Sequence, residues 1–573
     1  MRIRQLFTCS WPYLIFLLVA LVFLSPQLIS HVTLVGSDGL FHMNRFYDTA
    51  KQIQTGHFNL FQSNFGFEQS GRVINAVYGP LFAYLNGLIL AITQSWFGYE
   101  IISDLILFML AVCGMYQVTK QVKAPQWAGI MITIAFMGAG WMTRWMQYQN
   151  MTAWGAALAP FAVVQAIRLH ENPDDGIKIW PLALTMTVIM QIHVLSTIFF
   201  TVMLVPFFID AWIRSHRKRQ LWGQLLKSIG LTIIFTTNVW LNFLVLYSKN
   251  QIANPGAFVL SKNVLHLGIH LASRGTLSYL MIIMIFITIM LTAWQWRRSH
   301  DHLGLWLVIN GLVWLFLATN LFPWRWFDQN LPQLQSSLQF PYRLTIIAYP
   351  LLFAGLARSL SYLNNSHRAW RVIAQVVLIV ATFMAAGAVV NHTRHRCIIA
   401  QHKGLTSWTN TVSIVGYNQH LIKNYINSDH PGSLFLIIDK RHPDYLPVKY
   451  KLKGKQQYRA VTYQATIINH FRDFNHQVTK NGQLQISWQQ NQAGKIQLPL
   501  ITYQQSQLKL NGKKIGYQVN QIGVPTITAP AGHNTITLSF KLPFYYYPLL
   551  IVWGLSILFT LIWQIYRNAK RIR

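Results

Sequence analysis

The feature that most constrains this chain is a series of apolar runs, each long enough to cross a lipid bilayer. Runs of about 17–22 apolar residues recur over roughly the first 390 positions, and one more lies near the C-terminus. Only 11% of the residues are charged, whereas soluble domains carry nearer ~25%. The sequence therefore predicts a polytopic α-helical membrane protein in direct contact with the lipid bilayer.

Basic residues between the runs indicate which side of the membrane each connection faces. The candidate spans are residues 11–29, 77–94, 101–119, 126–142, 151–168, 178–193, 196–213, 226–247, 277–296, 303–320, 343–362, 372–391 and 546–566. Arg2, Arg4 and the basic run 214–219 mark the cytoplasmic side. Seven candidates lie between these markers, an odd number, so one of them does not span; the stretch 77–94, broken by Pro80, is one choice. We predict about 12 spans with both termini in the cytoplasm.

The polar part of the chain changes character near residue 455. Beyond it, short alternating runs are separated by turns at Asn511-Gly512 and Gly532–Asn534, a pattern typical of a small antiparallel β-sandwich. We therefore predict three parts: a transmembrane domain, residues 1–391, whose first outer loop is 31–76; an extracytoplasmic α/β to β-sandwich domain, residues 392–545; and a last span with a basic cytoplasmic tail, residues 546–573.

The net charge of +32 is large and indicates either an anionic partner or a particular location of the basic residues. Cytoplasmic loops rich in Lys and Arg, and an anionic substrate, both account for it in a membrane protein. No zinc-finger, RNA-binding or helix-turn-helix pattern is present, so a nucleic-acid partner is not predicted. The three cysteines lie far apart and form no metal-binding spacing.

The stretch 36–45, directly after the first span, carries the residues best suited to chemistry. Asp38 and His42 are four residues apart, so a helix would place both on one face. A partly desolvated carboxylate at the membrane mouth can take a proton from an attacking hydroxyl. The same carboxylate could instead hold a divalent metal such as Mg or Mn, or cap a short helix that begins at Gly39. If 77–94 does not span, the polar turn 144–150 falls outside, near Asp38.

Other polar residues of the outer loops are candidates for substrate binding. Glu68 is a second ligand or acceptor-binding group, or else a solvated acid, and Tyr78 precedes a helix that we expect to begin at Pro80. Arg343 lies at the outer end of a span, and the loop before it holds Arg325. Guanidinium groups bind phosphate in a bidentate manner, although an interfacial Arg also extends to lipid headgroups.

The loop 248–276 carries basic side chains at intervals of four. On a helix, these residues would form one cationic stripe suited to a diphosphate or polyanion: Lys262, His266, His270 and Arg274. The pair of histidines lacks a third ligand, so no zinc site is predicted. His193, inside an apolar segment, is expected to be a hydrogen-bonded packing residue.

These residues together resemble the GT-C integral-membrane glycosyltransferases. The motif Ser-Asp-Gly-x-x-His-x-x-Arg over 37–45 follows an uncleaved first span. Three further features are similar to the bacterial YfhO-like proteins, also labelled 6-pyruvoyl-tetrahydropterin-synthase-related membrane proteins: residues 339–343, residues 444–447 and a sandwich that leads into a final span over 538–548.

The resemblance implies a GT-C fold with Asp38 as the catalytic carboxylate and a polyprenyl-phosphate sugar as donor. It also places Arg45, at the end of the motif, among the substrate-binding residues. Many relatives carry an acidic pair in this loop, whereas Asp38 has no immediate acidic neighbour, which favours a metal-free base. The YfhO-like group is linked to glycosylation of lipoteichoic acid, so the acceptor implied is an anionic cell-envelope polymer, a teichoic or lipoteichoic acid or a wall polysaccharide.

The leading hypothesis is thus an inverting glycosyl transfer on the outer face of a bacterial plasma membrane. Asp38 would deprotonate the acceptor, His42 would orient it, and Arg343 would hold the departing lipid phosphate. Two alternatives remain: a transporter or flippase of lipid-linked sugar, which predicts charges deep within the spans, and a non-catalytic polymer-binding membrane protein.

Overall fold

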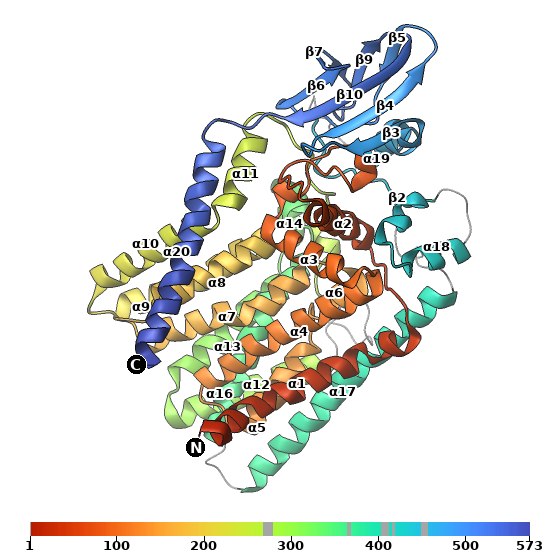
Figure 1. The fold of residues 1–573 in the computed structure, drawn as a ribbon. Coiled ribbons are helices and arrows are strands. Elements are labelled where there is room, and N and C mark those ends of the chain that lie inside the picture. The colour runs from red at the N-terminus through yellow and green to blue at the C-terminus, as the bar shows by residue number, and fades with distance from the viewer. Residues whose placement is uncertain are drawn as a thin grey trace.

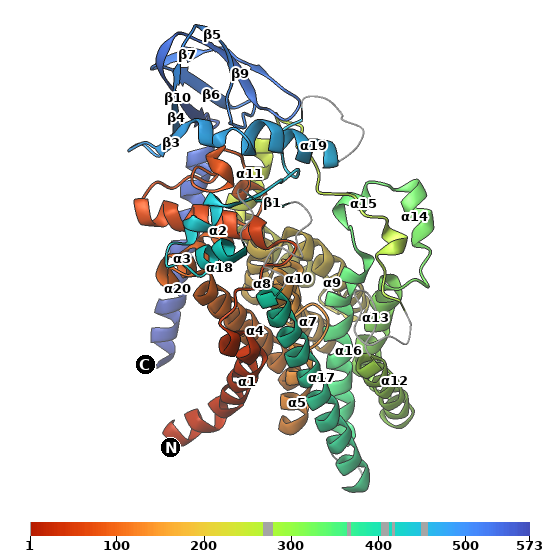
Figure 2. The same ribbon diagram turned by 90° about the vertical axis from the view of Figure 1, so that its right-hand side faces the viewer.

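The helices form a membrane layer, and most of the β-strands lie beyond one end of it (Figure 1). The computed structural model describes residues 2–266, 279–363, 368–402, 412–414, 419–448 and 456–572. Helix α1 (Arg2–Ser30) starts, and helix α20 (Tyr546–Ile572) ends, at the side of this layer opposite the β-sheets (Figure 2).

Within those described ranges, seven segments are long and apolar enough to cross a membrane. They are α1, α4 (Trp96–Gln121), α7 (Thr152–Glu171), α9 (Val194–Arg214), Pro341–Leu363 with helix α16 (Thr345–Leu363), α17 (Arg368–His402) and α20. Helices α10 (Lys218–Phe235) and α11 (Thr237–Tyr247) qualify together but bend by 66°. Four apolar helices are shorter: α3 (Pro80–Thr93), α5 (Gln126–Met137), α8 (Ile179–Ile192) and α13 (His302–Ala318). The protein is therefore a helical membrane protein, while the count of about 12 spans and the domain boundaries stay predictions.

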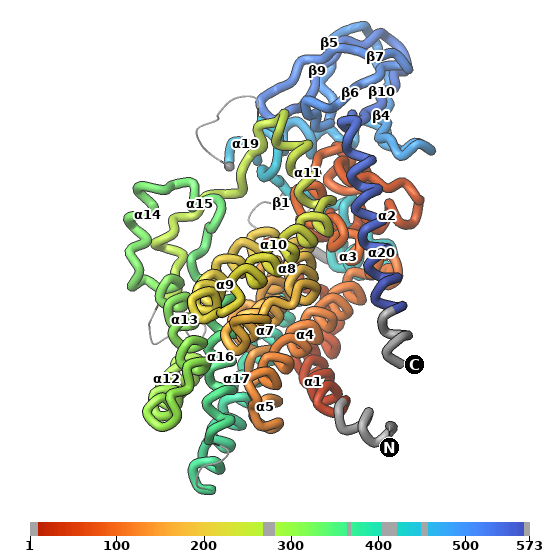
Figure 3. The backbone as a smooth tube through the Cα atoms, turned by 90° about the vertical axis from the view of Figure 1, so that its left-hand side faces the viewer, coloured from red at the N-terminus to blue at the C-terminus, as the bar shows by residue number. Residues whose placement is uncertain are grey.

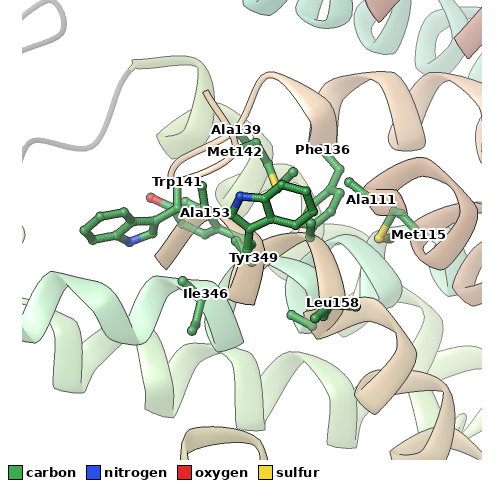
Figure 4. Packing of buried hydrophobic residues seen from close by; sticks show 14 of the residues in the cluster. Ala111, Met115, Phe136, Ala139, Trp141, Met142, Ala153, Leu158, Ile346 and Tyr349 are labelled. Atoms are coloured by element: carbon green, nitrogen blue, oxygen red, sulfur yellow. The ribbon is translucent and has the colours of Figure 1, made fainter. Parts of the chain in front are cut away.

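Burial separates the central helices from those that face lipid. The apolar windows of α7 and of Pro341–Leu363 are 89% buried, whereas those of α17 and α20 are 22% and 6% buried. Figure 4 shows Ala111 and Met115 of α4, Phe136 of α5, Leu158 of α7 and Tyr349 of α16 packed together in this centre. Because lipid tails are as apolar as these side chains, close packing rather than the hydrophobic effect holds the central helices together.

The remaining helices and the two-stranded sheet are made of shorter elements, with one exception, α12. They are α2 (Gly39–Thr55), α6 (Arg144–Tyr148), α14 (Trp324–Asn330), α15 (Leu334–Ser337), β1 (Val412–Ile414), α18 (Gln419–Ile426), β2 (Ile438–Lys440) and α19 (Gln456–Tyr463); α12 (Tyr279–Ser299) belongs to the helical layer. Helix α3 begins at Pro80, with proline in its first turn as predicted, and it packs against α2.

Two antiparallel sheets face each other across an apolar core, which confirms the predicted β-sheet domain. One has the order β3-β4-β10-β6-β7 and the other β5-β9-β8. Their bounds are β3 Asn475–Val478, β4 Leu484–Gln490, β5 Gly494–Gln497, β6 Ser506–Leu510, β7 Lys513–Ile515, β8 Gln518–Val519, β9 Pro525–Ala529 and β10 Gly532–Phe540. Alternate residues such as Leu484, Ile486, Ile536 and Leu538 are buried between the sheets.

Of the two turns predicted in the β-sheet domain, one is present and the other is not. Asn511 and Gly512 join β6 to β7 with φ of 49° and 82°, the positive values of a tight hairpin turn, so this prediction is confirmed. The turn predicted at Gly532–Asn534 is wrong, because these residues begin β10. The strand pattern predicted from residue 455 is also wrong over residues 456–468, where helical turns bury Ala460, Tyr463 and Ile467 at helical spacing.

Gly79 provides a test of the contact between the start of α3 and α8. A Cβ atom added to Gly79 would lie 1.4 Å from the carbonyl oxygen of Gln191, whereas one added to Gly223 of α10 would meet nothing within 4 Å. We expect Gly79→Ala to destabilise the protein by about 1–3 kcal/mol, the usual cost of forcing extra atoms into a packed site. Gly223→Ala should be neutral or mildly stabilising. Thermal unfolding midpoints in detergent would measure both, and equal midpoints would contradict the close approach.

Candidate functional site

A cavity of about 950 Å³ lies where the ends of several helices meet the segments that connect them. Its walls come from distant parts of the chain: the start of α2, α6, the start of α9, the loop 254–266, the start of the Pro341–Leu363 segment and residues 440–445. Six of the nine predicted site residues line it: Asp38, His42, Tyr78, Lys262, His266 and Arg343. Arg45, Glu68 and Arg325 do not.

The loop before Asp38 is held tightly against the turn that follows α6. A Cβ on Gly36 would lie 2.2 Å from the Cα of Tyr148, so only glycine allows this approach. Gln149 bonds the loop from both ends of its amide: its Oε1 accepts from the backbone N–H of Gly36 at 2.7 Å, and its Nε2 donates to the carbonyl of Leu34 at 2.9 Å. The predicted proximity of the turn 144–150 to Asp38 is therefore confirmed.

Asp38 occupies the N-cap position of α2, which begins at Gly39 as predicted, but its side chain accepts no capping hydrogen bond. Its Oδ2 instead accepts from Nδ2 of Asn150 at 3.3 Å. Burial raises the pKa of Asp38, and the nearby charges of Lys440 and Arg343 lower that pKa in part. The carboxylate is thus free of a helix-capping role and faces the cavity.

His42 is held in one tautomer by Arg45. Nη1 of Arg45 lies 3.1 Å from Nδ1 of His42. Because arginine only donates, Nδ1 accepts and the ring proton of the neutral imidazole resides on Nε2. Burial, and then the charge of Arg45, lowers the pKa of His42 well below its ordinary value. His42 is therefore a neutral hydrogen-bonding group in this cavity.

Arg45 is fully buried behind the cavity wall. Its Nε donates to Oδ1 of Asn75 at 3.1 Å, and its guanidinium lies 4.1 Å from the ring centre of Tyr78. The hydroxyl of Tyr78 is 3.2 Å from that of Tyr445, another cavity residue. Arg45 thus positions His42 and Tyr78 and does not reach the cavity, unlike the substrate-binding role predicted for it.

Arg343 is buried at the start of the Pro341–Leu363 segment, with 8% of its surface exposed. Nη1 donates to the carbonyl of Leu338 at 3.0 Å, and the guanidinium lies 4.7 Å from the ring centre of Phe340. Its Nε is buried and has no hydrogen-bond partner among the residues that the structure describes. An arginine that extended to lipid headgroups would be exposed, so this geometry favours an inward-facing anion site over the snorkelling alternative.

The cavity lining is strongly cationic. Five basic residues line it, against two acids, Asp38 and Asp444: Arg144, Lys262, Arg343, Lys440 and Arg441. Nζ of Lys440 donates to the carbonyl of Ser37 at 2.6 Å, next to Asp38. A concave surface with this excess of one sign concentrates ligands of the opposite sign. The cavity is therefore suited to an anionic ligand.

One wall of the cavity is aromatic. The rings of Trp141 and Tyr342 stack at 5.1 Å with an angle of 10°, and Arg144 lies 5.2 Å from the ring centre of Trp141. Flat rings beside a guanidinium present apolar faces and a positive charge together. This wall can contact the apolar face of a sugar ring while the cation holds a nearby anion.

The loop that contains Lys262 is not the predicted helix. Leu260–Lys262 form a single 3₁₀ turn, and residues 263–266 are irregular, so Lys262 and His266 line the cavity as exposed loop residues. His270 and Arg274 lie outside the described residues. Arg325 is exposed on α14, away from the cavity lining.

Glu68 is buried, so the expectation of a solvated acid is wrong. The hydroxyl of Tyr463 donates to its carboxyl group, and Glu68 lies on a segment, Phe67–Gln69, in which all three φ values are positive, from 46° to 54°. Burial is the main cause that raises the pKa of Glu68, and the charge of Asp439 raises it further. Burial also raises the pKa of Asp439, and Arg472 lowers that pKa in part. Since Asp439 pairs with Arg472 at 3.1 Å, Glu68 is the group that keeps a proton.

Lys440 and Arg144 were not predicted as site residues. Arg144 belongs to the polar turn 144–150, whose sequence placed it outside near Asp38, so its charge could have been found. Lys440 ends a short strand far along the chain, and nothing in the sequence connects it to residue 38. Among the residues that the structure describes, no group of three or more His, Cys, Asp or Glu side chains could hold a metal ion.

Comparison with known proteins finds 11 similar chains among solved structures, and two of these are described below. No protein-family model and no curated protein matches the chain. The arabinofuranosyltransferase AftD from Mycobacteria is 15% identical, with a TM-score of 0.42 over 69% of this chain and 27% of that chain. The oligosaccharyltransferase of Archaeoglobus fulgidus is 12% identical, with a TM-score of 0.36 over 68% of this chain and 56% of that chain. This chain thus spans about a quarter of the first protein and just over half of the second. At these scores the likeness carries no conclusion on activity.

The buried Glu68 predicts how stability changes with pH. The pKa of Glu68 is raised to about 8 in the folded protein, which therefore keeps a proton that the unfolded chain releases above about pH 4.3. Stability should fall as the pH rises between these two values and change no further above them through this group. The slope should reach up to about 1.4 kcal/mol per pH unit. Glu68→Gln keeps a neutral side chain at every pH and should flatten this dependence. Thermal midpoints across the pH range would show it, with exposed Asp429→Asn as the control; a Glu68→Gln midpoint that still falls as in the wild type would contradict the assignment.

Proposed function

We propose that this protein transfers a sugar from a polyprenyl-phosphate donor to a hydroxyl group of an anionic cell-envelope polymer, on the outer face of a bacterial plasma membrane. One observation carries the proposal: a partly desolvated carboxylate, Asp38, shares a cationic cavity with the buried Arg343. The acceptor class follows from the excess of basic residues in the cavity and in residues 392–545.

Asp38 acts as the general base in this proposal. The acceptor hydroxyl gives its proton to the carboxylate as its oxygen attacks the anomeric carbon of the donor. The new glycosidic C–O bond forms while the bond from that carbon to the phosphate oxygen breaks, and the electron pair leaves with the phosphate. Attack from the side opposite the leaving group inverts the anomeric centre. The raised pKa of Asp38 makes it a stronger base than an exposed carboxylate.

Arg343 and Lys440 stabilise the departing phosphate. Negative charge grows on the phosphate as the C–O bond breaks, and cations that are already in place lower the energy of that state. The guanidinium of Arg343 belongs to the cavity lining, where its positive charge can bind a phosphate group. The Nε2–H of His42 can donate to a hydroxyl of the acceptor and orient it, because Arg45 holds the ring proton on that nitrogen.

Transport of a lipid-linked sugar draws less support. Helix α4 does carry two buried acids, Glu100 and Asp104, within an apolar segment. However, Oε2 of Glu100 accepts from Gln27 at 2.6 Å and from the backbone N–H of Leu34 at 2.9 Å, so this acid joins α1 and the loop before Asp38 to α4. Neither acid lines the cavity. In a non-catalytic polymer-binding protein, the carboxylate of Asp38, which does not cap α2, would have no function.

Asp38→Asn tests the catalytic proposal. The amide has the same shape but cannot accept the proton, so we expect sugar transfer to fall by roughly 10²–10⁴-fold. Expression and the thermal midpoint should stay unchanged, because Asp38 makes no capping bond. The measurement is the return of the envelope glycan when a deletion strain is complemented with each variant. Asp473→Asn, an exposed acid of the outer domain, is the control, and full complementation by Asp38→Asn would remove the enzymatic claim.

Arg343→Gln tests the phosphate site. Loss of a hydrogen bond to a charged group costs about 1.5–3 kcal/mol, so binding of a short-chain polyprenyl phosphate should weaken by roughly 10–100-fold. Displacement of a fluorescent polyprenyl phosphate from the purified protein in detergent would measure this. Arg325→Gln removes an equal charge from a helix outside the cavity and should bind as the wild type does. Equal losses in both variants would assign the effect to overall charge.

A further inference from the structure

The outward face of the five-stranded sheet consists of uncharged polar and basic side chains. In β4 and β10 the residues that alternate with the buried core positions point away from the smaller sheet. The outward residues of these two strands are Gln485, Ser487, Gln489, His533, Thr535, Thr537 and Ser539. None of them is acidic or apolar. We call the outward side of this sheet the polar sheet face.

Strand pairing aligns one row of side chains across all five strands. The paired positions run in the order Gln477, Gln485, Thr537, Lys509 and Lys514. Nε2 of Gln477 donates to Oε1 of Gln485, and Nε2 of Gln485 lies 3.4 Å from the hydroxyl oxygen of Thr537. Neighbouring strands are about 4.8 Å apart, so the row is roughly 19 Å long. It can contact several units of a linear polymer.

A second row lies beside the first and has the same character. Asn475 of β3 pairs with Ser487 of β4, which pairs with Thr535 of β10. Amide groups both donate and accept hydrogen bonds, and hydroxyl groups do so as well. Two rows of such groups on a flat surface match the hydroxyl groups of a sugar or polyol chain.

The charge of the sandwich has a single sign. Residues 475–540 contain five lysines and neither Asp nor Glu. Surfaces of soluble domains usually mix both signs. Lys509 and Lys514 are directly opposite each other on neighbouring strands and both are exposed, an arrangement that costs stability unless an anion lies between them. Lysines on an edge strand prevent sheets from pairing, which accounts for Lys514 but not for Lys509 on the interior strand β6.

We propose that the polar sheet face binds a linear anionic polymer of sugar or polyol phosphate units. The amides and hydroxyls bond the hydroxyl groups of the chain, and Lys509 with Lys514 binds a phosphate group at one end of the row. The claim that this polymer is the acceptor rests on the proposed glycosyl transfer. Binding of the polymer to the polar sheet face does not depend on catalysis. In Figure 3 the sandwich lies on the same side of the helical layer as α2, whose first residues line the cavity.

The test measures binding of a fluorescent poly(glycerol phosphate) to the full-length protein in nanodiscs of uncharged phosphatidylcholine. We expect Lys509→Gln with Lys514→Gln to weaken binding by roughly tenfold, because two exposed ion pairs contribute up to ~1 kcal/mol each. Thr537→Glu, which places a carboxylate in the middle of the row, should weaken it as well. The control pair Lys495→Gln with Lys541→Gln removes the same charge from other positions and should bind as the wild type does.

Three results would overturn this proposal. Equal weakening by the two lysine pairs would show attraction to overall charge alone. Equally tight binding of a single-stranded DNA of matched charge would show that the hydroxyl groups are not recognised. Binding to phosphatidylglycerol vesicles but not to the polymer would assign the face to lipid. Asp38→Asn separates the two proposals: it should bind the polymer normally, and if it also transfers sugar normally, the catalytic proposal fails while the polar sheet face stands.

Discussion

The amide of Gln149 makes the contact on which the site depends. It bonds the backbone of residues 34 and 36 at the same time and so holds the first outer loop against the turn after α6. Gly36 allows that approach because it has no side chain. With the loop held there, Asp38 lies beside Asn150, and α2 extends from it in the direction that brings His42 into the cavity. Without this clamp, the loop after α1 would be free to move the carboxylate away from the cationic wall.

Two opposing electrostatic effects determine the pKa of the Asp38 carboxyl group. Burial raises its pKa, and Lys440 and Arg343 lower it. Burial alone favours the protonated, neutral form of a carboxyl group. A carboxylate tightly paired with a cation would be a weak base. The arrangement found lies between these limits, because neither cation forms a close ion pair with Asp38 in the described structure, while both belong to the same cavity.

Features that depend on neighbouring residues could be predicted from the sequence. Contacts between segments that are distant in the chain could not. The apolar runs, the start of α2 at Gly39, the start of α3 at Pro80 and the hairpin at Asn511-Gly512 each depend on a few neighbouring residues. Lys440 could not be placed, because its position near Ser37 depends on how the outer domain docks. The burial of Glu68 has the same origin, because Tyr463, nearly 400 residues later in the chain, covers this acid of a polar loop.

The docking of the outer domain also explains how a strained segment persists in the first outer loop. Three consecutive residues with positive φ cost of order 1–3 kcal/mol each, so Phe67–Gln69 must be held by its surroundings. The backbone N–H of Phe67 donates to Oδ1 of Asn44 on α2 at 2.7 Å, and Tyr463 covers Glu68. Just beyond the segment, Arg72 donates to the carbonyl of His442 at 3.1 Å, a cavity residue. The first outer loop therefore bonds both α2, which carries His42, and the segment that supplies Lys440. These two walls of the cavity are thus held in place by the same loop.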